Sequence, residues 1–311
     1  MTRIAVATGF HSWTRELGGV LREDEVVVLA PGDDARAASN AEVAIGGPNT
    51  ERFRALLAAA PDLRWYHTLS AGVEGLMIPE LAEHTGLVLT NNSGAYDAPI
   101  AEHVIATIFA AAKRLPQSVR AQARHEWHGD PKSADVRGST LVVLGMGSIG
   151  GELAAVARGI GMRVIGVRRG GGDGAVPPDR LAEIAAEADY LAICAPLTPE
   201  SRGLVGAEVI GRMKATAWLI NISRGAIVDE DALLGALRGG RIAGAAIDAW
   251  WTEPLPADSP WWDLENVIVT PHTSFSSPSV RDRSLALILE NLRRYKAGQT
   301  LLNVVDPQKG Y

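Results

Sequence analysis

The sequence predicts an α/β protein with two lobes, each built around a doubly wound parallel sheet. Short, almost wholly apolar runs alternate along the chain with alanine- and leucine-rich helical stretches, a pattern typical of buried parallel strands and the helices that connect them. The 311 residues exceed the roughly 150 residues of a typical domain, so two domains are expected. A glycine-rich turn at residues 145–150 leads from one apolar run straight into a helix.

Five apolar runs near the N-terminus form the first series of strands. They are expected at residues 4–7, 26–29, 43–45, 63–67 and 87–90. Asp97, with Pro99 in the first turn, is expected to be the N-cap of a long helix that continues to Ala112. A second helical stretch is expected from Gln117 to about Trp127.

Six further apolar runs form a second series of strands. They are expected at residues 140–144, 163–167, 190–194, 217–222, 242–248 and 267–270. Helical stretches fill most of the intervals, as the connections of a parallel sheet require. Pro278 then opens an amphipathic helix that is expected to run to about Ala297.

The charge balance and the single cysteine indicate the surroundings of the protein. A net charge of −6 and a pI near 5.7 provide no long-range attraction to nucleic acid or to an anionic membrane. Cys194 alone cannot form an intrachain disulfide, and no apolar run reaches the ~20 residues of a membrane span or resembles a secretory signal. We therefore expect a cytoplasmic protein with neither a nucleic-acid nor a membrane partner.

The glycine-rich turn LGMGSIG has the spacing G-x-G-x-x-G, between a strand and a helix. A dinucleotide needs this context, because the tight turn, the bare backbone and the helix N-terminus let a pyrophosphate approach. The residues expected to contact the cofactor here are Gly145, Met146, Gly147, Ser148, Ile149 and Gly150. Glycines at strand-to-helix turns can also serve packing alone, and this alternative stays open.

The residues after the next strand favour NADP(H) over NAD(H). A carboxylate that would bond the ribose 2′-hydroxyl of NAD is expected there, but Arg168 and Arg169 take its place, followed by three glycines. A guanidinium group can pair with a 2′-phosphate and cannot accept hydrogen bonds from ribose hydroxyls. As an alternative, both arginines are simply solvated at a strand end, and the nearby Asp173 keeps NAD(H) open as the second cofactor.

Three polar residues, Arg224, Glu253 and His272, stand at or just after predicted strand ends of the second series. Ligands of doubly wound sheets bind beyond the carboxyl ends of the strands, so the three side chains can converge on one molecule. Hydride transfer to a ketone needs a proton donor, a group that keeps the donor protonated, and a cation that holds the substrate. His272, Glu253 and Arg224 match these roles in turn, although each alone could be an ordinary surface or loop residue.

The order of these motifs resembles the D-isomer-specific 2-hydroxyacid dehydrogenase family, which includes glyoxylate/hydroxypyruvate reductases. The matching stretches are LSAGVEGL, GAYDAPIAEHV, LGMGSIG, APLTPES, LINISRGAIVDEDAL, DAWWTEPLP and VTPHTS. The resemblance implies two Rossmann-like domains, a substrate domain of residues 1–97 and 280–311 around an inserted cofactor domain of residues 98–279. It also implies that a nicotinamide cofactor exchanges a hydride with a small 2-keto or 2-hydroxy acid.

The resemblance implies roles for individual residues. The family's catalytic arginine, carboxylate and histidine match Arg224, Glu253 and His272. Backbone amides are expected to hold the substrate carboxylate, together with Arg224, at Ala71, Gly72 and Val73. Further cofactor contacts are expected at Ala195, Pro196, Ile222 and Asp248, the last beside the nicotinamide carboxamide. The helix at Asp97 resembles the family's dimer-forming segment, which implies a homodimer.

Several alternatives remain at this point. Trp250 and Trp251 stand where the family more often has one aromatic residue, and they could narrow the substrate pocket or pack between the lobes. A non-catalytic NAD(P)-sensing protein, like the family's corepressors, is the main alternative to an enzyme, while adenosylhomocysteine hydrolases and amino acid dehydrogenases lack this motif series. No metal site is expected, since His125 and His128 share one predicted helical face without a strong third ligand.

Overall fold

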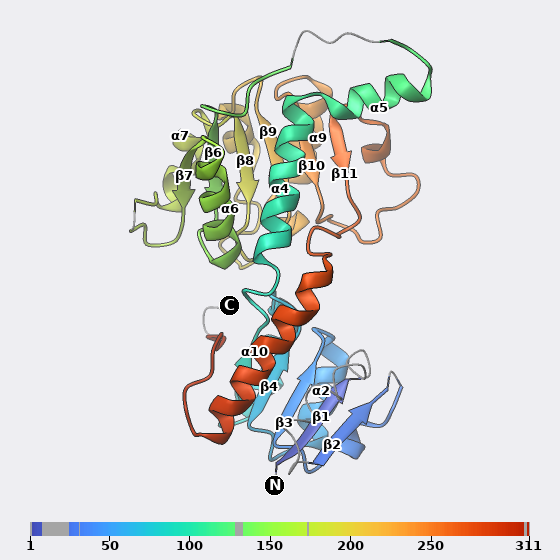
Figure 1. Cartoon of the computed structure of the whole chain (residues 1–311), viewed down its shortest axis with the longest axis vertical. Coiled ribbons are helices and arrows are strands. Elements are labelled where there is room, and N and C mark those ends of the chain that lie inside the picture. The colour runs from blue at the N-terminus through green and yellow to red at the C-terminus, as the bar shows by residue number, and fades with distance from the viewer. Residues whose placement is uncertain are drawn as a thin grey trace. The chain divides into compact units, whose positions relative to one another are not determined.

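The computed structural model describes residues 2–7, 25–30, 32–127, 133–172, 174–307 and 310. The chain divides into two compact units, here called unit 1 (residues 1–96 and 277–311) and unit 2 (residues 97–276). Figure 1 shows one parallel sheet in each unit. Within the described ranges, no helix has the length and apolar character needed to cross a membrane.

Unit 1 is built on a five-stranded sheet whose neighbouring strands are all parallel, in the order β2-β1-β3-β4-β5. The strands are β1 (Arg3–Ala7), β2 (Glu25–Leu29), β3 (Val43–Gly46), β4 (Trp65–Thr68) and β5 (Val88–Thr90). Alternate strand residues face opposite helices. Ile288 and Leu292 of α10 (Pro278–Lys296) pack on one face, and Phe53 and Leu56 of α2 (Thr50–Ala59) on the other.

Unit 2 is built on a six-stranded parallel sheet in the order β11-β10-β9-β8-β6-β7. Its strands are β6 (Thr140–Leu144), β7 (Arg163–Val167), β8 (Tyr190–Ile193), β9 (Trp218–Asn221), β10 (Gly244–Ile247) and β11 (Val267–Val269). The doubly wound α/β fold expected from the sequence is confirmed. The strand order reverses between β6 and β8, and ligands of such sheets bind at this reversal, beyond the carboxyl ends of the strands.

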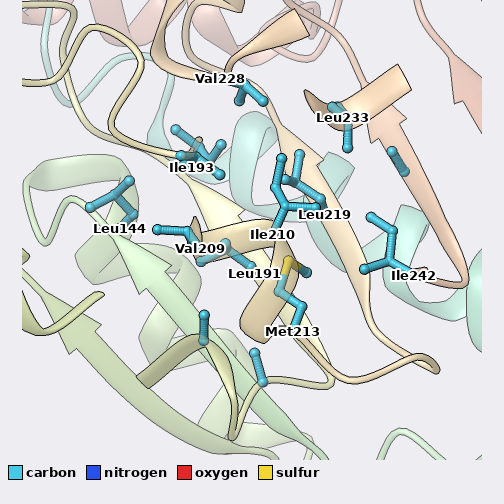
Figure 2. Packing of buried hydrophobic residues seen from close by; sticks show 14 of the residues in the cluster. Leu144, Leu191, Ile193, Val209, Ile210, Met213, Leu219, Val228, Leu233 and Ile242 are labelled. Atoms are coloured by element: carbon cyan, nitrogen blue, oxygen red, sulfur yellow. The ribbon is translucent and has the colours of Figure 1, made fainter. Parts of the chain in front are cut away.

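Helices cover both faces of the unit 2 sheet. On one side α4 (Asp97–Ala112) and α6 (Ser148–Gly159) pack against each other (Figure 1). On the other side lie α7 (Leu181–Ala185), α8 (Ala207–Arg212) and α9 (Glu230–Arg238). Figure 2 shows the resulting apolar core, in which Ile210 and Leu233 of these helices meet Leu191 and Leu219 of the strands.

The remaining helical segments within the described ranges are short. They are η2 (Ala35–Ala38), η3 (Glu74–Leu76), α3 (Pro79–Glu83), α5 (Leu115–Ala123), η4 (Pro178–Arg180), η5 (Gly225–Ile227) and η6 (Pro260–Asp263).

Two expectations about the helices are wrong. The long helix starts at Asp97 itself, so this residue is not the N-cap; its carboxylate instead accepts a hydrogen bond from Ser148 Oγ. The next helix, α5, ends at Ala123 instead of Trp127, because the N–H of Glu126 bonds back to Ala121 O and His125 takes a left-handed φ of 58°. His125 is therefore not on a helical face, and His128 lies outside the described residues.

A buried polar network lies in the core of unit 1. Trp65 Nε1 donates to Thr90 Oγ1 at 2.8 Å, and the same oxygen lies 2.8 Å from His67 Nδ1. A threonine hydroxyl that accepts from Trp65 can donate its own proton to His67 Nδ1, which leaves the proton of the neutral ring on Nε2. Nearby, Asn92 Nδ2 donates to Ser284 Oγ of α10 at 2.8 Å, so the network joins the sheet to this helix.

Lowering the pH is expected to destabilise unit 1 through His67. Burial lowers the pKa of His67 from 6.5 to about 4, against an opposing effect of the Asn92 side chain. The unfolded chain then binds a proton that the folded chain does not, so stability present above pH 6.5 is lost as the pH falls toward 4. Between about pH 7 and about pH 5, the free energy of unfolding should fall by about 2 kcal/mol more in the wild type than in His67→Gln. Equal losses in denaturant titrations of the two proteins would contradict this prediction.

Candidate active site

The glycine-rich turn follows β6, at the strand-order reversal of unit 2. Gly145 has a φ of 100°, and a Cβ there would overlap the backbone of Ala195, while a Cβ on Gly150 would overlap Gly145 O. These two glycines are thus required by the protein's own packing. Gly147 differs, because a Cβ there would meet no protein atom within 4 Å, and both Gly147 and Ser148 are exposed at the start of α6. The turn therefore has room for a phosphate at Gly147, beside the N–H groups of the helix start.

Two arginines follow β7 and are exposed, as a phosphate contact requires. Arg169 Nη2 lies 3.2 Å from Glu200 Oε2, and the same carboxylate oxygen accepts a hydrogen bond from Thr198 Oγ1 at 2.8 Å. These contacts lower the pKa of Glu200, with Thr198 the largest cause. No sequence pattern indicated that Arg169 would pair with Glu200, which lies in the stretch after β8. Asp173, the residue that kept NAD(H) open, lies outside the described residues.

Arg224 stands in the turn between β9 and η5. Asn221, the last residue of β9 and fully buried, shapes this turn by donating from Nδ2 to Arg224 O (3.0 Å) and accepting at Oδ1 from Ser223 N (3.1 Å). Gly225 is required here, because a Cβ would lie 2.5 Å from the backbone of Trp250 and Trp251. This close approach brings the turn of Arg224 against the loop that carries Glu253.

Glu253 and His272 form a hydrogen-bonded pair. His272 Nδ1 lies 2.8 Å from Glu253 Oε2 and 3.0 Å from Oε1, and both side chains are about one-third exposed. The backbone N–H of Trp250 donates to Glu253 Oε1 at 2.8 Å, which holds the carboxylate in place. With Nδ1 engaged by the carboxylate, Nε2 is the ring nitrogen left to exchange a proton with a substrate.

Asp248 holds the segment on both sides of His272. The carboxylate follows β10, is only 1% exposed, and accepts from Thr270 Oγ1 (2.6 Å) and Thr273 N (2.9 Å) at Oδ1 and from Ser274 N (3.0 Å) at Oδ2. Burial raises the pKa of Asp248, but the hydrogen bonds from Ser274, Thr270 and Thr273 outweigh it and leave the pKa below its ordinary value. A charged Asp248 therefore supports the left-handed backbone of His272, whose φ is 53°. The expected contact of Asp248 with the nicotinamide carboxamide stays a prediction.

The adjacent tryptophans belong to the core of unit 2. Trp250 and Trp251 lie with their ring centroids 5.7 Å and 5.3 Å from that of the buried Trp261. The indole N–H of Trp250 donates to Thr270 O at 2.9 Å, and that of Trp251 to Val228 O at 2.9 Å. Both tryptophans therefore have ring and hydrogen-bond partners within unit 2.

The loop after β4 in unit 1 contains Ala71, Gly72 and Val73. Among the described residues, none of these three consecutive backbone N–H groups donates a hydrogen bond to another protein atom. Ala71 and Gly72 are partly exposed. Unpaired backbone N–H groups can donate hydrogen bonds to an anion such as a carboxylate.

The structure thus brings Arg224, Glu253, His272 and Asp248 into neighbouring loops at the carboxyl ends of β9, β10 and β11. Sequence reasoning did not find the supporting side chains Asn221 and Thr270, although a polar residue at a strand end was the available signal. It also did not indicate that the backbone N–H of Trp250 holds Glu253. In the described ranges, no group of three or more His, Cys, Asp and Glu side chains is placed as metal ligands would be.

Comparison with known proteins assigns the family. The model of the D-isomer specific 2-hydroxyacid dehydrogenase NAD binding domain matches residues 105–274, more than half of the chain. The chain belongs to this family. It is therefore an NAD(P)-dependent oxidoreductase, as the resemblance implied.

Individual dehydrogenases of the family resemble most or all of the chain. The glyoxylate reductase of Korarchaeum cryptofilum is 36% identical over 80% of this chain and 78% of its own. The glyoxylate/hydroxypyruvate reductase B of Pectobacterium atrosepticum is 36% identical over 89% of each chain. Among solved structures, a D-isomer specific 2-hydroxyacid dehydrogenase of Xanthobacter autotrophicus, in complex with NADPH and MES, is 29% identical, with a TM-score of 0.86 over 100% of this chain and 99% of that one. These names support an enzyme over the corepressor alternative.

Proposed function

We propose that this dehydrogenase reduces a small 2-keto acid, of the glyoxylate or hydroxypyruvate type, to the D-2-hydroxy acid with NADPH. The observation that carries the proposal is the Glu253–His272 pair, with Nδ1 held at 2.8 Å and Nε2 left for the substrate. The names of the relatives, glyoxylate reductase and glyoxylate/hydroxypyruvate reductase B, support this substrate class.

The residues of unit 2 fit NADPH. Gly147 provides open space at the N-terminus of α6 for the pyrophosphate, and the exposed Arg168 and Arg169 would pair with the 2′-phosphate. Ala195, close to Gly145, would line the cofactor. When bound, NADPH supplies the hydride. The NADPH in the Xanthobacter autotrophicus structure supports this choice of cofactor.

The reaction follows from the side chains. In unit 2, the Arg224 guanidinium polarises the keto group. In unit 1, the backbone amides at residues 71–73 bind a carboxylate. His272 donates the Nε2 proton to the carbonyl oxygen as negative charge develops there. Glu253 accepts a hydrogen bond from Nδ1, which orients the ring and stabilises the imidazolium before transfer. In the reverse direction, neutral His272 removes the hydroxyl proton.

The proposal is tested by the oxidation of NADPH by the purified protein with glyoxylate, hydroxypyruvate, pyruvate and a bulkier 2-keto acid. We expect turnover with glyoxylate or hydroxypyruvate, a slower reaction with NADH, and a D-configured product where the product is chiral. NADPH binding without turnover of any 2-keto acid would contradict the proposal and favour a sensing role.

We further propose that two copies of the chain pair through α4 and α5. Large apolar side chains are exposed along this segment, at Phe109, Leu115, Val119 and Trp127. A homodimer would bury them, in line with the resemblance of this segment to the family's dimer-forming helix. The mass in solution should then be twice the 32.9 kDa of one chain, and Val119→Glu should lower it; an unchanged monomeric mass for both proteins would contradict the proposal.

A further inference from the structure

Asn91, the first residue after β5, contacts the loop proposed to hold the substrate carboxylate. Its Nδ2 donates to Ala71 O at 3.0 Å, and its Oδ1 accepts from Ser93 N at 3.1 Å. One partner is an acceptor and the other a donor, so the orientation of the amide group is determined by its surroundings. The side chain is thus a short clamp between two loops at the carboxyl end of the unit 1 sheet.

The clamp determines the direction of the next backbone N–H. In a trans peptide the C=O of one residue and the N–H of the next lie in one plane and point in opposite directions. When Asn91 holds the carbonyl of Ala71, the N–H of Gly72 must point away from Asn91. Gly72 N–H is one of the three unpaired amides of the loop among the described residues.

The C-terminal segment holds Asn91 in turn. Asn91 N donates to Asn303 O at 3.1 Å, and Asn303 Nδ2 donates to Ser93 O at 2.6 Å and to Asn91 O at 3.3 Å. Val305 N donates to Leu89 O at 2.9 Å, which extends the contact along β5. Asn303 has a φ of 57°, a left-handed conformation that asparagine tolerates better than most residues.

We propose that Asn91 is a positioning residue for the substrate carboxylate and that the C-terminal segment at Asn303 keeps it in place. This inference rests on the proposed function, because it assumes that the amides at residues 71–73 bind the carboxylate. The carboxylate is bound equally in the ground state and the transition state, so a loosened loop raises KM and leaves kcat nearly unchanged.

Asn91→Ala tests the proposal directly. We expect KM for the best 2-keto acid of the panel to rise about tenfold, because the free energy lost with one hydrogen bond corresponds to roughly this factor. The value of kcat should stay within about twofold of the wild type, and the Kd of NADPH should be unchanged. The matched control is Asn266→Ala in unit 2, which also loses an asparagine-to-carbonyl hydrogen bond, from Nδ2 to Leu237 O at 3.2 Å. The control should leave KM unchanged.

Asn303→Gly provides a second variant that keeps the left-handed backbone but removes the side chain. It should raise KM in the same direction as Asn91→Ala, by a smaller factor. Equal KM values in the wild type and in both folded variants, as judged by their thermal unfolding, would overturn the inference while the proposed function stands.

Binding of oxamate, an unreactive analogue of a small 2-keto acid, separates the two proposals. Its Kd in the presence of NADPH should rise about tenfold in Asn91→Ala, even if the wild type reduced no 2-keto acid and the proposed function failed. If oxamate bound equally to the wild type and Asn91→Ala, the inference would be overturned whatever the activity.

Discussion

His272→Ala is expected to lower kcat for 2-keto acid reduction by about 10²- to 10⁴-fold, the usual contribution of a general acid. Nε2 of the imidazole is left to donate a proton to the substrate, since Nδ1 lies 2.8 Å from Glu253 Oε2. The alanine variant keeps the carboxylate, Arg224 and the glycine-rich turn. Steady-state kinetics with glyoxylate or hydroxypyruvate measure the loss, and fluorescence titration should show NADPH binding within about twofold of the wild type.

His84→Gln is the control for this change. His84 lies in unit 1, where Nε2 is 3.3 Å from Ala60 O, and has no place in the proposed reaction. Its replacement should leave kcat unchanged. Wild-type turnover in His272→Ala would remove His272 as the proton donor and leave the family assignment untouched.

The double variant Arg168→Ala/Arg169→Ala is expected to reduce the preference for NADPH over NADH by about 10²-fold or more. Each guanidinium in a charge-assisted hydrogen bond to phosphate contributes roughly 1.5–3 kcal/mol, and NADH has no 2′-phosphate to lose. In the variant, Glu200 also loses its cation, because Arg169 is its ion-pair partner at 3.2 Å. An unpaired carboxylate beside the site should repel the 2′-phosphate further. The ratio of kcat/KM for the two cofactors measures the change.

Arg180→Ala/Arg238→Ala provides a matched control. Both residues are exposed and lie in unit 2, and their loss changes the net charge equally. The control should leave the cofactor ratio unchanged, which separates a local phosphate contact from the general electrostatic field. If the Arg168/Arg169 variant weakened NADPH and NADH equally, the phosphate interpretation would be wrong.

Most strands were predictable because they are buried, and the edge strand β2, with no buried residue, is still an apolar run. A parallel strand covered by helices is a short, continuous apolar run, and every strand within the described ranges overlaps such a run. The helix ends were harder to predict. The end of α5 coincides with the left-handed residue His125, and Asp97 at the start of α4 contacts Ser148, 51 residues away along the chain.

The residues of the candidate site were predictable from the sequence, but the groups that hold these residues in place were not. Glycine spacing and motif order pointed to the turn at Gly145 and to Arg224, Glu253 and His272. No pattern indicated that Trp250 would hold Glu253 through its backbone N–H, or that Glu200 would pair with Arg169. Such contacts join loops that follow different strands, and their partners depend on the strand order in the sheet.

The sequence alone therefore determined the fold class, the family and the residue types of the site, since apolar periodicity and motif spacing are local properties of the chain. The tertiary structure decided which groups support the site. Asp248 brackets His272, the tryptophans pack inside unit 2, and Asn303 reaches Asn91 from more than two hundred residues away. The physical reason is that a buried hydrogen bond needs its partner within about 3 Å, and only the folded chain brings these partners together.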